Sequence, residues 1–283
     1  MSKIDSLKTS FDTKTFVFEI LASFLLILFV LLSYYSFFKS KKNKNLYLFS
    51  IILTFSFFLT IFLTLGIAGF AANRPINTFL LPQLVISDAF ILGIQKDFRG
   101  AILSKGIAYL LTAQLLGVLL AILVFYALFK ALEKMQTTEE DRKFSFQEFL
   151  FIKEEKILVF AFKELFFITT MTLGLITIPR ISGAVNFTFF NILIIEIIFI
   201  FFLLLLSARF GFFTFTFFKY WLDLVIFSII SWKNKTLVQN KSLIINVLIQ
   251  NTIRTLISVV APIVISLILL SISASSNLTF KFT

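Results

Sequence analysis

Long apolar runs separated by short polar stretches dominate this chain. A helix that crosses a membrane needs about 20 predominantly apolar residues. Six runs reach that length, and they cover residues 15–38, 46–70, 107–130, 187–208, 212–232 and 252–273. A seventh run, 157–178, is nearly as apolar but is interrupted by Lys163 and Glu164. The pattern predicts an all-α integral membrane protein with six transmembrane helices.

Two weakly apolar segments are too short to cross a membrane: 71–84 (AANRPINTFLLPQL) and 238–250 (VQNKSLIINVLIQ). Each lies between full spans, in corresponding places in the two halves of the chain. Paired short segments of this kind occur where half-helices dip to the bilayer midplane in transporters and channels built from inverted repeats. Interfacial connectors between spans would give the same spacing, so both interpretations stay open at this stage.

The composition agrees with a membrane protein and excludes several kinds of chemistry. The 283 residues are 59% hydrophobic and 14% charged, whereas soluble domains are about 45–50% apolar. The chain has no His and no Cys, which excludes imidazole catalysis, thiol nucleophiles and the usual zinc, haem and iron–sulfur ligands. The sequence also has no phosphate-binding glycine loop. We therefore expect no enzymatic activity, no cofactor and no metal.

The formal net charge of +11 has a simple interpretation in a membrane protein. Lysine-rich loops beside the spans are attracted to anionic lipid headgroups. We therefore expect the bilayer, and not nucleic acid, to be the partner of the basic residues.

Four strings in the spans carry a resemblance to a known family. The first run contains FEILASFLLILFVLL, with Glu19 among apolar residues, and the run 187–208 contains IIEIIFIFFLLLLSA, with Glu196 in the matching place. AYLLTAQLLGVLLAIL and VVAPIVISLILL follow in the third and last runs. In this order and spacing, the strings resemble the aquaporin and glycerol-facilitator family of major intrinsic proteins. The resemblance covers nearly the whole chain outside 134–168.

The resemblance implies six spanning helices and two half-helices arranged as two inverted repeats. It places the first repeat at 1–134 and the second at 169–283. The segment 135–168 between them is charged and then amphipathic, as expected of either a helix lying at the interface or a solvated loop. The carboxylates of Glu19 and Glu196 are implied to lie in the interior and to hold the half-helix loops through backbone hydrogen bonds.

The same resemblance locates the half-helix tips, where the family has Asn-Pro-Ala. The first tip aligns with Asn73, Arg74 and Pro75, and the second with Asn240, Lys241 and Ser242. Both asparagines remain, but Arg74 and Lys241 would place two cations where the family has none. An ionisable group near the bilayer centre costs at least about 2.5–3.5 kcal/mol. Either both cations reach outward and pair with Glu19, Glu196 or Asp223, or they line a constriction.

The family's selectivity filter aligns with Leu53, Ser228, Leu237 and Leu243. The last position holds an Arg in the family, and here it is Leu243. An apolar constriction tends to exclude water and close. These residues therefore argue against selective conduction, whereas the resemblance favours it.

Two functions follow from these observations. The first is a divergent channel for passive transport of small polar solutes such as glycerol or water. The second is a non-conducting scaffold or subunit of a membrane protein complex, derived from such a channel. The resemblance implies a multi-pass protein of the cell membrane and a homotetramer. It also implies cytoplasmic termini, although the basic loops would then face outward, against the positive-inside rule.

Overall fold

The computed structural model describes residues 3–39, 45–72, 76–94, 105–135, 146–185, 189–209 and 215–276. These residues form helices and connecting segments, and no strand occurs among them. The first predicted half-helix tip, Asn73, Arg74 and Pro75, lies outside the described residues.

The described helices differ strongly in length. In chain order they are α1 (Lys3–Lys8), α2 (Thr13–Lys39), α3 (Leu46–Ala72), α4 (Pro82–Ile94), α5 (Lys105–Met135), the 3₁₀ turn η1 (Phe146–Phe149), α6 (Ile157–Val185), α7 (Phe189–Arg209), α8 (Phe217–Lys233) and α9 (Lys241–Ser276). Within the described residues, α2, α3, α5, α6, α7 and α9 are long and apolar enough to cross a membrane. The chain is therefore a helical, multi-pass membrane protein.

The starts of three helices follow from their first residues. At the start of α2, Asp12 Oδ2 accepts a hydrogen bond from Thr15 N at 2.8 Å, which satisfies one of the free amides of a helix N-terminus. Pro82 begins α4, at a position where a missing N–H costs nothing. Thr216 caps α8, because its side chain accepts from Phe218 N.

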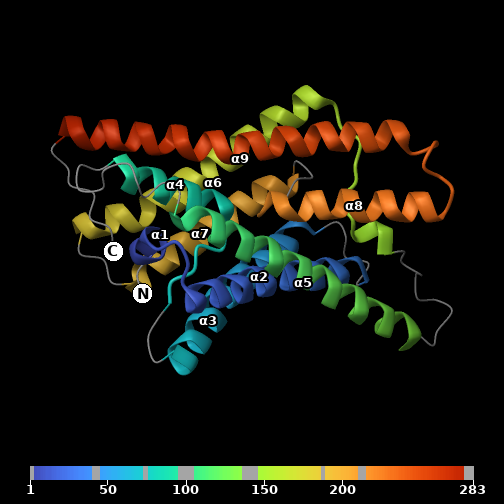
Figure 1. Cartoon of the computed structure of the whole chain (residues 1–283), viewed down its shortest axis with the longest axis horizontal. Helices are drawn as coiled ribbons and strands as arrows, with labels where there is room; N and C mark the ends of the chain where they lie inside the picture. Colours follow the sequence, from blue (N-terminus) through green and yellow to red (C-terminus); the bar gives the residue numbers. More distant parts are fainter. Residues whose placement is uncertain are drawn as a thin grey trace.

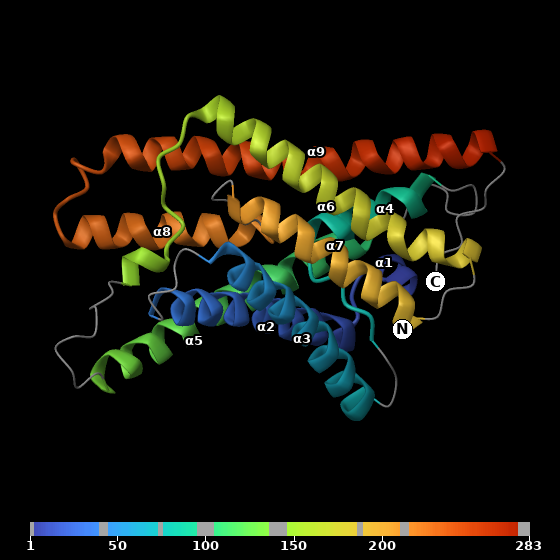
Figure 2. The ribbon, with the colours of Figure 1, turned by 180° about the vertical axis from the view of Figure 1, so that it is seen from behind.

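The helices follow the same order of lengths twice. The series α2, α3, α4 and α5 has two long helices, a short one and a long one, and α6, α7, α8 and α9 repeat that order. In each series the first long helix packs along the last, α2 along α5 and α6 along α9, and α3 packs against α7 between the series. Figures 1 and 2 show α8 beside α9, and α4 packed below α9 on the other side of the centre.

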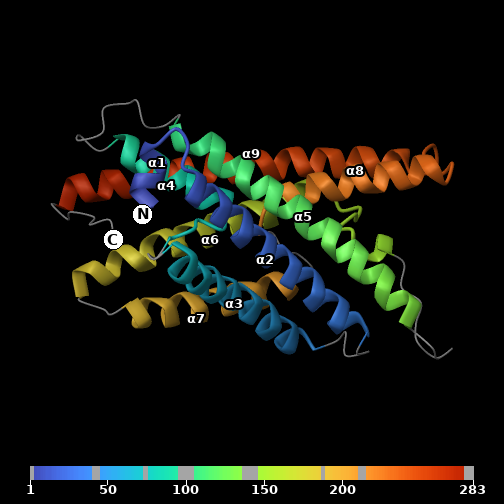
Figure 3. The ribbon, with the colours of Figure 1, turned by 60° about the horizontal axis from the view of Figure 1, so that its bottom comes forward.

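One large hydrophobic cluster, here called the central cluster, joins both series. It includes Leu53 and Phe57 of α3, Leu81 before α4 and Phe215 before α8. Buried residues of α2, α5, α6 and α7 complete it. Figure 3 shows these helices gathered around one another below α8 and α9.

Two of the predicted apolar runs differ in helix length from what hydropathy indicates. The run 157–178 lies within the 29-residue helix α6, which is long enough to span. The run 212–232, in contrast, contains the 17-residue helix α8 instead of a full span. The predicted boundary at 168–169 also falls inside α6, so the segment taken as the end of an insertion is the first part of a spanning helix. The ion pair between Lys163 and Glu155 explains part of this difference, because it compensates the charge that interrupts the run.

The two segments predicted as half-helices do not coincide with separate short helices. Of the segment 71–84, residues 71–72 end α3 and 82–84 begin α4, so the short helix of the first series starts later than predicted. The segment 238–250 contains the first turns of α9, and α9 is the longest helix described. Within the two series of four helices, the short helices are α4 and α8.

Candidate functional site

The starts of the two short helices lie in the central cluster. Leu80 and Leu81 precede α4 and are 7% and 0% exposed, and Phe215 precedes Thr216 and α8 and is 6% exposed. Phe215 stacks on Phe57 of α3, with ring centroids 6.0 Å apart. From there α4 and α8 extend toward opposite ends of the molecule (Figures 1 and 2). The structure thus brings two helix N-termini to one buried region.

Glu19 fixes the chain in front of α4. Its Oε2 accepts from Phe79 N at 2.9 Å and its Oε1 accepts from Leu80 N at 3.0 Å. Gln114 of α5 donates from Nε2 to the same Oε1 at 2.7 Å. Leu80 has a φ of 64°, a left-handed conformation that costs a residue with a side chain about 1–3 kcal/mol. The buried carboxylate therefore holds a strained backbone in place and joins it to α2 and α5.

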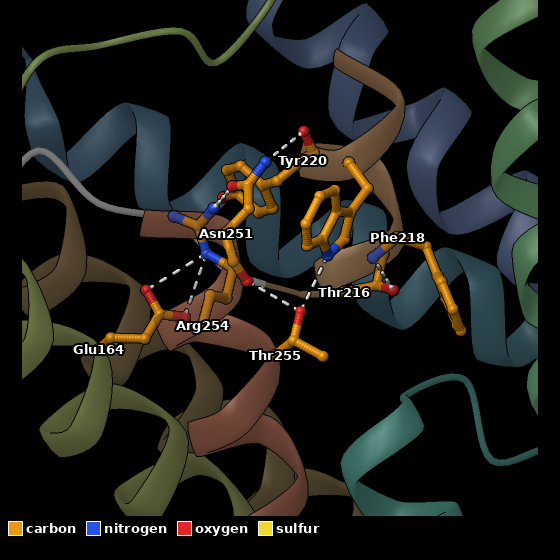
Figure 4. A network of polar contacts seen from close by, with 8 residues as sticks. Glu164, Thr216, Phe218, Tyr220, Asn251, Arg254 and Thr255 are labelled. Carbon is orange, nitrogen blue, oxygen red and sulfur yellow. Dashed lines mark hydrogen bonds and ion pairs between the residues drawn. The ribbon is translucent and has the colours of Figure 1, made fainter. Parts of the chain in front are cut away.

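A second buried polar centre joins α6, α8 and α9 (Figure 4). Arg254 Nε lies 3.3 Å from both carboxylate oxygens of Glu164, and Arg254 Nη1 donates to Asn251 Oδ1 at 2.9 Å. Asn251 Nδ2 in turn donates to the carbonyl of Tyr220 at 2.9 Å. The guanidinium carbon lies near two aromatic rings, 3.5 Å from the centroid of Tyr220 and 5.0 Å from that of Phe160. Charge, hydrogen bonds and aromatic faces together stabilise this cation inside the bundle.

Figure 4 also shows how α8 is tied to α9 beyond its cap. Trp221 Nε1 donates to Thr255 Oγ1 at 2.9 Å. Thr255 lies one turn after Asn251 on α9, and Trp221 directly follows Tyr220 on α8, so the two hydrogen bonds are neighbours along the same contact. The N-terminal half of α8 is therefore held to α9 by side chains of both helices.

Lys219 and Asp223 form a third buried polar contact on α8. Lys219 Nζ lies 2.5 Å from Asp223 Oδ2, and the two side chains are 5% and 2% exposed. Asp223 Oδ2 also accepts from Phe151 N at 3.1 Å, and Lys219 Nζ lies 4.1 Å from the centroid of the Phe151 ring. These contacts bind the segment before α6 to the short helix α8. Ionisable residues inside membrane bundles are costly and are typical of functional sites.

The second predicted half-helix tip is not at the start of a half-helix. Asn240 ends a short turn at 234–240, where its Nδ2 donates to Ser231 Oγ at 3.0 Å. Lys241 and Ser242 are exposed and begin the 36-residue helix α9. Asn favours turns because its side chain bonds to nearby groups and tolerates unusual backbone angles, which explains its place here. Asp223, considered as a partner for Arg74 or Lys241, pairs with Lys219 instead.

The predicted filter residues occupy different surroundings. Leu53 is fully buried in the central cluster. Ser228 lies on α8 and bonds to the carbonyl of Leu224 in its own helix. Leu237 is exposed in the turn and Leu243 is half-buried at the start of α9. Among the predicted filter residues, only Leu53 belongs to the cluster where the short helices begin.

Glu164 is the buried carboxylate near the start of α6, whereas Glu196, the predicted counterpart of Glu19, is half-buried on α7. Glu19 and Glu164 both lie near the start of the first long helix of their series, and both are 0% exposed. The strings FVFEILASF and FAFKELFFI share an F-x-F start, but this match aligns Glu19 with Lys163, so the sequence alone does not pair Glu19 with Glu164. Sequence analysis missed Glu164, Lys219 and Arg254 as buried groups.

Comparison of the chain with protein-family models, with curated proteins and with solved structures finds no match. Within the part of the chain that the structure describes, there is also no group of three or more metal-ligating side chains. The function must therefore be argued from the geometry of the buried centres.

Proposed function

We propose that this chain is a divergent aquaporin-like channel of the cell membrane, which passes small polar solutes such as glycerol or water. In this proposal α2–α5 and α6–α9 are two inverted repeats, and α4 and α8 are the half-helices. Four copies would form the tetramer that the sequence resemblance implies. The channel needs no cofactor and no energy source.

The observation that carries the proposal is the shared origin of the two short helices. Both start beside residues of the central cluster and extend in opposite directions. The N-terminus of a helix carries a partial positive charge and free N–H groups. Short helices that start at membrane depth in corresponding places of two halves are typical of a transport site. Glu19 supports this arrangement, since it holds the backbone immediately before α4.

A second function is favoured by the residues at that point. Leu80, Leu81, Phe57 and Phe215 are apolar and buried, and an apolar constriction excludes water. A chain closed in this way would serve as a non-conducting scaffold or as a subunit of a membrane complex. The two functions differ in one measurable quantity, the solute flux.

The test is stopped-flow permeability of proteoliposomes for glycerol and water. The wild type is compared with a Leu81→Ala, Phe215→Ala double variant, which removes volume from the constriction. Phe70→Ala is the matched control, because Phe70 of α3 is 92% exposed and does not belong to the central cluster. A channel predicts flux above empty liposomes and a several-fold increase in the double variant, with Phe70→Ala equal to wild type. Flux at the empty-liposome level in all three proteins would favour the scaffold.

A further inference from the structure

Residues 232–241, here called the basic turn, connect the end of α8 to the start of α9. Asn240 Nδ2 donates to Ser231 Oγ at 3.0 Å, and Asn240 N donates to Thr236 O at 3.0 Å. Thr236 N donates back to Ser231 O at 2.9 Å. These hydrogen bonds close the turn, so its residues share one small region of the surface. Figures 1 and 3 show it at the end of the molecule opposite α1.

Lys235 ends α8 in a conformation that suits glycine better. Its φ is 58°. Lys235 N donates to Trp232 O at 3.1 Å, and Thr236 N donates to Ser231 O, which is the usual hydrogen-bond pattern where a helix is followed by a residue of positive φ. Gly is strongly favoured at this position because it has no Cβ. The chain therefore has a lysine where glycine would be more stable, which indicates that the side chain serves a purpose other than folding.

The basic turn carries positive charge and no negative charge. Its lysines, Lys233, Lys235 and Lys241, are all exposed, and the sequence has no Asp or Glu from 224 to 283. The segment 153–156 contacts α9 where Gln250 Nε2 donates to Lys153 O at 3.2 Å. That segment has two lysines and two glutamates, so it adds no net charge. A charged partner of the basic turn is therefore an anion.

Large apolar side chains are exposed beside these lysines. Trp232, Leu237 and Val238 are 74%, 41% and 85% exposed. The turn directly precedes the stretch Lys241–Ile272, which is long and apolar enough to cross a membrane, so the turn lies where the bilayer meets water. Trp is enriched at that depth, and lysines there are attracted to anionic headgroups. Apolar and basic side chains together fit a lipid better than a soluble anion.

We propose that the basic turn is a binding site for anionic phospholipid, and that Lys235 is kept in its strained conformation for its charge. The three lysines attract the phosphate of the headgroup, and each raises binding roughly fivefold. Trp232 and Val238 provide the apolar contact with the upper part of the lipid. This inference goes beyond the proposed conduction, because it concerns a lipid partner and is measured without any solute flux.

The test is the fluorescence of Trp232 in the full-length protein in bilayers. The chain has two Trp residues, so Trp221→Phe leaves only Trp232. Bilayers of equal parts phosphatidylglycerol and phosphatidylcholine are prepared twice, with bromine on the acyl chains of one lipid and then of the other. We expect brominated phosphatidylglycerol to quench Trp232 more strongly, with a preference of tenfold or more. Equal quenching by the two lipids overturns the proposal.

A second pair of proteins gives the same comparison without the Trp221→Phe change. The quenching of the wild type minus that of Trp232→Phe is the contribution of Trp232, and the hydrogen bond from Trp221 to Thr255 stays intact. The lipid preference is therefore measurable even if Trp221→Phe does not fold.

Two triple variants with the same loss of charge show whether the preference belongs to the basic turn. The first replaces its three lysines by Gln, and we expect it to quench equally with both lipids. The control replaces three exposed lysines near α1 by Gln and keeps the wild-type preference; they are Lys8, Lys14 and Lys105. A preference that survives in the first variant, or that is lost equally in the control, would contradict a site in this turn.

Lys235→Gly tests the strained position itself. Gly adopts a positive φ without strain, so we expect a Tm higher by about 1–3 °C in detergent, together with a lipid preference that is roughly fivefold lower. Lys235→Gln keeps the strain and loses the charge, so it lowers the preference without raising the Tm. A purely structural lysine would not show these opposite changes. An unchanged lipid preference in Lys235→Gly, or a Tm no higher than that of the wild type, counts against the proposal.

Discussion

The two series of helices stabilise an equivalent buried carboxylate in different ways. Glu19 of the first series is held by uncharged donors, two backbone N–H groups and the amide of Gln114. Glu164 of the second series faces the full positive charge of Arg254. The first carboxylate fixes the connection in front of a short helix, whereas the second joins α6 and α9, the first and last helices of its series.

This difference shows that a buried carboxylate can either fix a backbone connection or hold two helices together. Backbone N–H groups cannot move without the backbone, so a carboxylate that accepts their hydrogen bonds also fixes the backbone conformation. An Arg side chain is long and can reach a carboxylate from several backbone positions, so the pair at Arg254 holds α6 to α9 without fixing the loop before α8. In the second series that start is fixed instead by Thr216, Trp221 and Tyr220.

The largest expected effect comes from breaking the charged centre. Arg254→Met leaves Glu164 buried without its cation, which costs about 3–5 kcal/mol of the free energy of unfolding. Replacing both partners, as Glu164→Leu with Arg254→Met, removes the unpaired charge and recovers most of that loss. Thermal or denaturant unfolding in detergent measures both proteins. A double variant no more stable than Arg254→Met would show that the two residues are not energetically coupled.

The uncharged centre is expected to be more tolerant. Glu19→Gln keeps one acceptor for the amides of Phe79 and Leu80 and loses the other, which costs about 1–3 kcal/mol. The equivalent change Glu164→Gln leaves Arg254 without its counter-charge, so we expect a larger loss. The two Gln variants are compared by unfolding under the same conditions. Equal losses would mean that the two carboxylates are stabilised in the same way.

The smallest expected effect concerns how closely the helices approach around Glu19. A Cβ on Gly117 of α5 would lie 2.5 Å from Ile20 O and 2.8 Å from Ser23 Cβ of α2. Gly117→Ala therefore forces α2 and α5 apart, at a cost of about 1–2 kcal/mol typical of overpacking. Gly66→Ala on α3 is the matched control, because nothing lies within 4 Å of its Cβ position. Unfolding in detergent measures both variants. A Gly117→Ala variant as stable as the wild type would contradict a tight α2–α5 contact.

Much of the architecture could be predicted from the sequence, because lipid imposes a simple length requirement. The runs around 15–38, 46–70, 107–130, 187–208 and 252–273 each lie largely within a long helix of the structure. Hydropathy alone could not predict that α6 is a long helix and α8 a short one. Lys163 and Glu164 count against α6 as single residues, but Lys163 pairs with Glu155 just before the helix, and Glu164 pairs with Arg254, which is 90 residues away.

The candidate site was harder to predict than the helices. The burial of Glu19 follows from its apolar neighbours, and its carboxylate accepts hydrogen bonds from the backbone of Phe79 and Leu80. Asn240 was predicted at the start of a half-helix, but it ends a turn before the 36-residue helix α9, and Asn is well suited to a turn. Gln83 and Pro82 lay inside a predicted half-helix, but only the packing of α4 against α6 and α9 shows that the amide is buried.

The pairing of Glu164 with Arg254 also bears on how the protein is made. A charged residue inside a helix lowers its tendency to enter the bilayer alone, and the two partners are 90 residues apart in the chain. During synthesis α6 therefore reaches the membrane long before α9 can neutralise it. Glu19 likewise receives a late partner, because Gln114, which donates a hydrogen bond to it, follows 95 residues later. The buried polar contacts of each series are thus completed by its last helix, α5 or α9, and a chain that ends before α9 has no cation for Glu164.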